Sequence, residues 1–66
     1  MKKTRIQFDT LQQARSKALD CGGRIAFQPV TDKVFWYSFD HTMTEIFNDT
    51  DSMGDWIIGG YDSFRI

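Results

Sequence analysis

The chain has 66 residues, a hydrophobic fraction of 41% and a formal net charge of −1. This hydrophobicity excludes a disordered chain, and the length predicts a single domain, residues 1–66, near the lower limit for independent folding. One cysteine and one histidine cannot supply an internal disulfide or four ligands for a structural zinc, so we expect no metal and no other cofactor.

The sequence also predicts where the protein is found. No apolar run approaches the roughly 20 residues of a membrane span, and "MKKTRIQF" lacks the apolar core of a secretory signal. Together with the unpaired Cys21, these features predict a cytoplasmic protein without a membrane partner.

Charged residues are distributed unevenly along the chain. Residues 1–33 hold seven of the eight basic residues and three aspartates, whereas residues 34–66 hold six acidic residues and Arg65. We therefore expect the folded domain to have a basic side and an acidic side.

A strand followed by a helix is predicted for residues 4–23. In "TRIQF", residues Thr4, Ile6 and Phe8 alternate with polar residues, which is typical of a strand covered on one face. The helix has an N-cap at residue 9 or 10, a glutamine capping partner at residue 12 or 13, and a glycine end at residue 22 or 23. Its narrow apolar face consists of Leu11, Ala14, Ala18 and Cys21.

The remaining residues carry mostly strand signals. Strands are predicted at residues 24–28, 34–39 and 56–60, with a turn at residues 29–33. Residues 43–47 fit either a strand or a helical turn, and hairpin spacing favours the strand. We therefore predict an α+β fold with a single helix on one face of a four- or five-stranded, mainly antiparallel sheet, in the order β-α-β-β-β-β.

The stretch "VFWYSF", residues 34–39, decides how the two faces of this sheet are assigned. Because side chains alternate along a strand, burying three aromatics there leaves Trp36 on the open face. The covered face is then predicted to hold Ile6, Phe8, Ile25, Phe27, Phe35, Tyr37 and Phe39. The open face is predicted to hold Trp36 with Lys3, Arg5, Gln7, Arg24, Ala26 and Gln28.

Two alternatives to an exposed Trp36 stay open. The C-terminal tail, with Tyr61 and Phe64, could fold over Trp36 and form a second small core. A different strand register would reverse the parity of the whole strand.

No motif in the sequence predicts catalysis or metal binding. His41 lacks a nucleophile at a recognisable position and reads as a turn residue. Asp49, Asp51 and Asp55 read as a solvated acidic loop, because the calcium-loop spacing is absent. Cys21, at the C-terminal end of the helix, is predicted to be an inert core residue.

The segment "GRIAFQPVTDKVFWYSF" resembles the paired RNP motifs of cold-shock domains, which stack single-stranded nucleic acid on sheet aromatics. The resemblance implies Phe27 and the aromatics of residues 35–39 as the stacking residues. The segment departs from the family at residues 24–26, where the family has its aromatic and glycine positions, and a helix precedes it.

A second resemblance covers about forty residues. "TRIQF", "TLQQARSKALDCGGRI" and a hairpin into "VFWYSF" are similar in order and spacing to small phage-encoded inhibitors of the anti-CRISPR type. This resemblance implies a noncatalytic protein that binds a host protein or ribonucleoprotein complex and blocks nucleic-acid access. It carries over no functional residue by motif.

The sequence therefore predicts a noncatalytic binding protein of this inhibitor type in the cytoplasm of a host cell. An exposed Trp beside cations is a composition typical of binding hot spots. Free single-stranded nucleic acid is the second hypothesis, and self-association into a homodimer through Trp36 is the third. The predicted partner-binding residues are Lys3, Arg5, Gln7, Arg24, Gln28 and Trp36.

Overall fold

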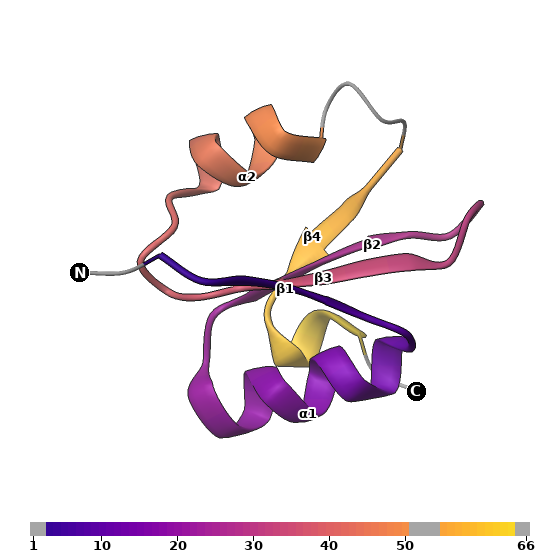
Figure 1. Cartoon of the computed structure of the whole chain (residues 1–66), viewed down its shortest axis with the longest axis horizontal. Helices are drawn as coiled ribbons and strands as arrows, with labels where there is room; N and C mark the ends of the chain where they lie inside the picture. The colour runs from indigo at the N-terminus through magenta and orange to yellow at the C-terminus, as the bar shows by residue number, and fades with distance from the viewer. Residues whose placement is uncertain (1–2, 51–54, 65–66) are drawn as a thin grey trace.

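The computed structural model describes residues 3–50 and 55–64, in which two helices pack with a four-stranded antiparallel sheet (Figure 1). The sheet has the strand order β1-β3-β2-β4. This architecture confirms the predicted α+β class. The elements in chain order are β1 (Arg5–Phe8), α1 (Leu11–Cys21), β2 (Arg24–Gln28), β3 (Lys33–Tyr37), α2 (Met43–Thr50), β4 (Ile57–Gly59) and the 3-10 helix η2 (Tyr61–Phe64).

Helix α1 begins and ends at the predicted signals. The Thr10 hydroxyl accepts a hydrogen bond from the backbone N–H of Gln13 at 3.2 Å, and the Gln13 side chain accepts from the N–H of Thr10 at 3.1 Å. Gly22 ends the helix with φ +75°, and its N–H donates to the carbonyl of Ala18 at 2.8 Å. Both ends satisfy backbone groups that a helix leaves unpaired, so residues 11–21 form a defined helix.

The strand register places Trp36 on the α1 face of the sheet. Trp36 lies opposite Ile6 on β1 and opposite Ile25 on β2. Since residues directly opposite one another share a face, all three lie on the same side. The prediction was correct for β1 and β2 but wrong for β3, where Phe35 and Tyr37 lie on the other face. Phe39 follows β3 and is 70% exposed.

The core beneath α1 explains this parity. Ala14 and Ala18 are buried, and short side chains let the helix approach the sheet closely enough to cover Val34 and Trp36. Phe64 of η2 is buried in the same cluster. The tail thus belongs to the same core as Trp36, whereas one alternative expected it to fold over Trp36 and form a second small core.

The opposite face of the sheet is covered by α2, where a strand had been favoured. Residues 43–47 are helical because Thr42 and Glu45 form a capping box: the Thr42 hydroxyl accepts from the N–H of Glu45 at 3.1 Å, and the Glu45 carboxylate accepts from the N–H of Thr42 at 2.8 Å. Figure 1 shows α1 and α2 on opposite sides of the sheet. The single-helix prediction was therefore wrong, and both faces of the sheet are covered.

A second cluster fills the space between α2 and the sheet. Ile46 of α2 is fully buried against Ala26 and Tyr37, and partly buried large side chains pack around them. The Phe35 and Trp56 rings lie 5.7 Å apart between centroids. This cluster supplies the cover that "VFWYSF" needs on its second face.

Candidate protein-binding surface

Trp36, the centre of the predicted binding surface, is buried inside the domain. Its side chain is 4% exposed, and its indole N–H donates to the carbonyl of Gly22 at 2.7 Å. A Cβ added at Gly23, which has φ +84°, would collide with the carbonyl of Tyr37 and crowd the Trp36 ring. The Gly22–Gly23 pair therefore both ends α1 and receives the indole, so Trp36 cannot be a surface contact.

The two predicted cations of β1 are paired with acids of α2. Lys3 forms an ion pair with Glu45, and Arg5 forms one with Asp49. The Arg5 guanidinium also lies 5.0 Å from the centroid of the Phe35 ring. The basic and acidic halves of the sequence thus meet across the α2 face, and these charges are engaged within the domain.

Three ionisable side chains at the contact between α2 and the sheet have shifted pKa values. The contact with Lys3 lowers the pKa of Glu45 to about 2, and the hydroxyl of Tyr37, which donates to Asp49 at 2.7 Å, lowers the pKa of that carboxyl. Burial is the main cause that raises the pKa of Tyr37 to about 12. Arg5, Tyr37 and Asp49 therefore form one network that attaches α2 to the sheet.

The other predicted contact residues differ in how far they are buried. Gln7 is exposed and Arg24 is half-buried, whereas Gln28 is buried and its side chain accepts a hydrogen bond from the Thr31 hydroxyl at 2.6 Å. The structure therefore does not gather the six predicted residues on one open surface. Three of them are exposed: Arg5 and Gln7 belong to β1, and Lys3 lies two residues before its first residue.

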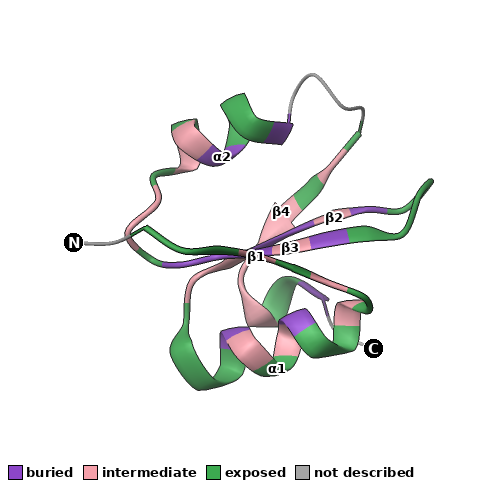
Figure 2. Cartoon of the chain, in the orientation of Figure 1, coloured by how far each residue is buried: buried purple, intermediate pink, exposed green. Residues whose placement is uncertain are grey.

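Strand β1 is an edge strand whose outer side pairs with no other described strand. The N–H of Ser38 donates to the carbonyl of Thr4 at 2.9 Å, so Thr4 directs its backbone groups towards β3. Because an antiparallel ladder alternates, Ile6 and Phe8 do the same, and Arg5 and Gln7 direct theirs outward. The free edge therefore offers two N–H and two C=O groups. Figure 2 shows β1 alternating between exposed and half-buried residues.

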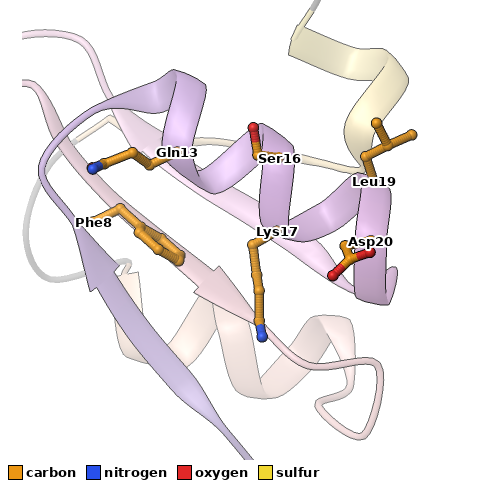
Figure 3. A pocket seen from close by; sticks show the side chains of 6 residues that line it. All are labelled: Phe8, Gln13, Ser16, Lys17, Leu19 and Asp20. Atoms are coloured by element: carbon orange, nitrogen blue, oxygen red, sulfur yellow. The ribbon is translucent and has the colours of Figure 1, made fainter.

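A groove runs beside this edge, between β1 and the flank of α1. Its volume is about 620 Å³. Figure 3 shows the Phe8 ring pointing into it from β1 and Lys17 extending across it from α1. The lining residues are Phe8, Gln13, Ser16, Lys17, Leu19 and Asp20.

The groove combines apolar and charged groups. Leu19 is 67% exposed, although a leucine gains by burial. The Lys17 ammonium lies 5.1 Å from the centroid of the Trp36 ring, so the groove wall touches the buried indole. Sequence reasoning missed this site. The available signal was the spacing of Gln13, Lys17 and Asp20, which places them on one flank of α1 beside its apolar face.

The lone histidine and cysteine lie outside the groove. His41 follows β3, and its ring meets that of Tyr37 edge to face at 5.1 Å between centroids. Cys21 is a free, exposed thiol, so its predicted core position was wrong. Of the predicted acidic loop, Asp49 belongs to α2 and Asp51 lies outside the described residues.

Within residues 3–50 and 55–64, no three His, Cys, Asp or Glu side chains gather in a way that could hold a metal ion. None of the described helices combines the length and apolar character required to cross a membrane. Comparison with protein-family models, with curated proteins and with solved structures finds no match to this chain.

Proposed function

We propose that this chain is a noncatalytic binding protein that holds a segment of a larger protein in the groove between β1 and α1. The observation that carries this proposal is the groove itself, in which the half-buried Phe8 lies near Lys17, while the exposed Leu19 lines the far end and points away from Phe8 (Figure 3). Hot spots of protein interfaces combine a desolvated apolar anchor with a surrounding polar rim. The groove offers both parts of that arrangement.

The lining residues indicate the chemistry of the bound segment. An apolar side chain would cover Phe8, and a carboxylate beside it would reach Lys17. Gln13 and Ser16 supply polar groups for the backbone of the segment. We therefore expect a short segment in which an apolar residue is followed or preceded by an acidic one.

For the identity of the partner, we propose the class that the sequence predicted, a host protein or ribonucleoprotein complex whose access to nucleic acid is blocked by occupancy. The proposed contact surface, however, differs from the one that the sequence predicted. Trp36 is buried, and Lys3 and Arg5 are paired with α2, so the groove replaces them as the proposed point of contact.

The hypothesis of single-stranded nucleic-acid binding receives less support, because that mode needs exposed rings for stacking. Within residues 34–39, all of which the structure describes, Phe39 is the exposed aromatic, while Phe35, Trp36 and Tyr37 lie beneath a helix. A purified protein that binds single-stranded oligonucleotides in a salt-dependent manner would restore this hypothesis.

The proposal is tested at two exposed aliphatic positions, Leu19 and Val30. After affinity capture identifies a partner, its binding to purified variants is measured by calorimetry. Leu19→Asp in the groove should weaken binding by about tenfold or more, whereas Val30→Asp, at a turn residue that is 88% exposed, should change it by less than about twofold. Equal affinities for the two variants would contradict the proposed site.

A further inference from the structure

The outer edge of β1 lacks two of the features that protect edge strands in natural proteins. Such edges are blunted by proline, by bulges, by charged side chains or by short length. Residues 5–8 contain no proline, and β1 pairs with β3 without interruption from Arg5 to Phe8. The charge of Arg5 is held by Asp49 of α2. The edge is therefore suited to pairing with another strand.

We propose that a second copy of this chain occupies this edge, with the two β1 strands antiparallel about a two-fold axis at Ile6. In this register, Arg5 of each copy lies opposite Gln7 of the other. Each such pair exchanges two backbone hydrogen bonds, so the two pairs form four, and every outward N–H and C=O of Arg5 and Gln7 is satisfied. The proposal goes beyond the proposed function and does not depend on it.

Charge repulsion and the cap of α1 disfavour the neighbouring registers. Only residues with outward backbone groups can pair, so the axis can pass through Arg5, Ile6 or Gln7. An axis at Arg5 would place two arginines directly opposite each other, which is destabilising. An axis at Gln7 would pair Arg5 with Asp9, whose N–H already donates to the Gln13 side chain at 3.1 Å in the cap of α1.

Side chains support the register centred on Ile6. The two Ile6 side chains meet on the α1 face, where each is half-buried in the single copy. On the α2 face, the uncharged Gln7 side chain of one copy lies opposite Arg5 of the other, so neither of these two pairs sets like charges against each other. The strand is thus complementary to itself in hydrogen bonding.

This dimer would also complete the groove. A two-fold axis perpendicular to the sheet keeps both α1 helices on the same face. The groove beside each β1 then meets its copy across the seam, with the paired strands as floor and an α1 helix as wall on each side. The groove, which is open on one side in the single copy, would then be bounded by an α1 helix on each side.

Disulfide trapping tests the register directly. With Cys21 replaced by serine, Ile6→Cys places two thiols at the axis, opposite each other in a pair that is not hydrogen-bonded, about 4.5 Å apart at Cα. That separation fits a disulfide. The matched control, Gln7→Cys in the same background, places the thiols two residues out of register. Mild oxidation should cross-link Ile6→Cys and leave Gln7→Cys at background; the reverse, or equal yields, would overturn the register.

Mass measurement in solution tests the dimer without added cysteines. The wild-type chain should sediment at twice 7.7 kDa at concentrations up to about 1 mM, the range of weak association. Gln7→Pro removes an outward N–H that the monomer does not use, so the variant should fold and remain monomeric, whereas Gln7→Ala should dimerise. A monomeric wild-type chain would refute the dimer. Groove binding, judged by Leu19→Asp, would be unaffected by that result.

Discussion

The two faces of the sheet are held by different kinds of interaction. Beneath α1, buried apolar side chains surround Trp36, and the indole N–H is satisfied by the carbonyl of Gly22. Beneath α2, the cluster around Ile46 is bordered by the network of Arg5, Tyr37 and Asp49. The stability of the first face should therefore be insensitive to pH and salt, whereas that of the second should depend on both.

This difference also shows how a 66-residue chain uses ten aromatic residues. A single helix could cover only one face of the sheet, so aromatic residues on the other face would have formed an exposed apolar patch that favours aggregation. With α2 in place, alternate residues of β3 serve two separate clusters. Five variants or conditions should distinguish the two faces.

Trp36→Ala should have the largest effect. Removing a buried Trp costs about 3–5 kcal/mol of unfolding free energy, which is a large part of the total for a domain of this size. Trp36→Phe keeps an aromatic ring and loses the hydrogen bond to Gly22, so it should be milder. Urea denaturation measures both. A Trp36→Ala variant as stable as wild type would mean that Trp36 is not in the core.

Ile46→Ala tests the second face. The expected loss is about 2 kcal/mol, at the low end for such a truncation, because α2 covers this cluster from one side only. Hydrogen exchange should then become faster in α2 than in α1, since local opening detaches the less strongly held element. Equal acceleration in the two helices would show that the faces unfold as one unit.

Tyr37→Phe removes the hydroxyl that donates to Asp49 while keeping the buried ring. A hydrogen bond to a charged group contributes about 1.5 kcal/mol or more, so urea denaturation should show a loss of about that size. The same measurement on an Asp49→Asn background should show a smaller loss, because the charged acceptor is already absent. Additive losses in the double variant would contradict the network.

Stability should change with pH through the α2 face. Folding lowers the pKa of Glu45 from 4.5 to about 2 and also lowers that of Asp49. Carboxyls with lowered pKa values stabilise the fold above their unfolded pKa, and this contribution is lost as pH falls through the folded pKa. The urea midpoint should therefore drop between pH 4.5 and about 2.

Tyr37 acts in the opposite sense at high pH. Its pKa is raised from 10.0 to about 12, so its contribution to stability is present below pH 10 and is lost as pH rises towards 12.

A Glu45→Gln, Asp49→Asn double variant tests the acid prediction, because it should flatten the acid side of the profile of urea midpoint against pH. An acid profile identical to that of wild type would show that these pairs do not contribute.

Cys21→Ser should have the smallest effect. The thiol is exposed at the last residue of α1, so the change in unfolding free energy should stay within about 0.5 kcal/mol. The folded wild-type protein should also react with a thiol reagent without denaturant. A protected thiol would place Cys21 in the core, as the sequence had suggested.

Local signals in the sequence predicted much of the fold, and long-range pairing determined the rest. The capping residues and glycines of α1 act within a few positions, and the alternation in β1 and β2 is visible strand by strand. The parity of β3 depends on its pairing with Ile6 and Ile25 and on α2, which was mistaken for a strand. The Thr42–Glu45 capping box was the overlooked local signal.

The candidate site was harder to predict for the same reason. The groove arises only when the flank of α1 is set beside β1, and the helix pattern indicates a polar flank without indicating what it faces. The predicted contacts Lys3, Arg5 and Gln7 are exposed. Their grouping around Trp36 failed once the parity of β3 was reversed.

Proton–proton contacts of the Trp36 ring, measured by NMR on the wild-type chain, show which helix covers Trp36. We expect contacts with the methyl groups of Ala14 or Ala18 of α1, together with an indole N–H protected from solvent exchange by the Gly22 carbonyl. Contacts with Ile46 of α2, or a rapidly exchanging indole N–H, would show that Trp36 does not lie beneath α1.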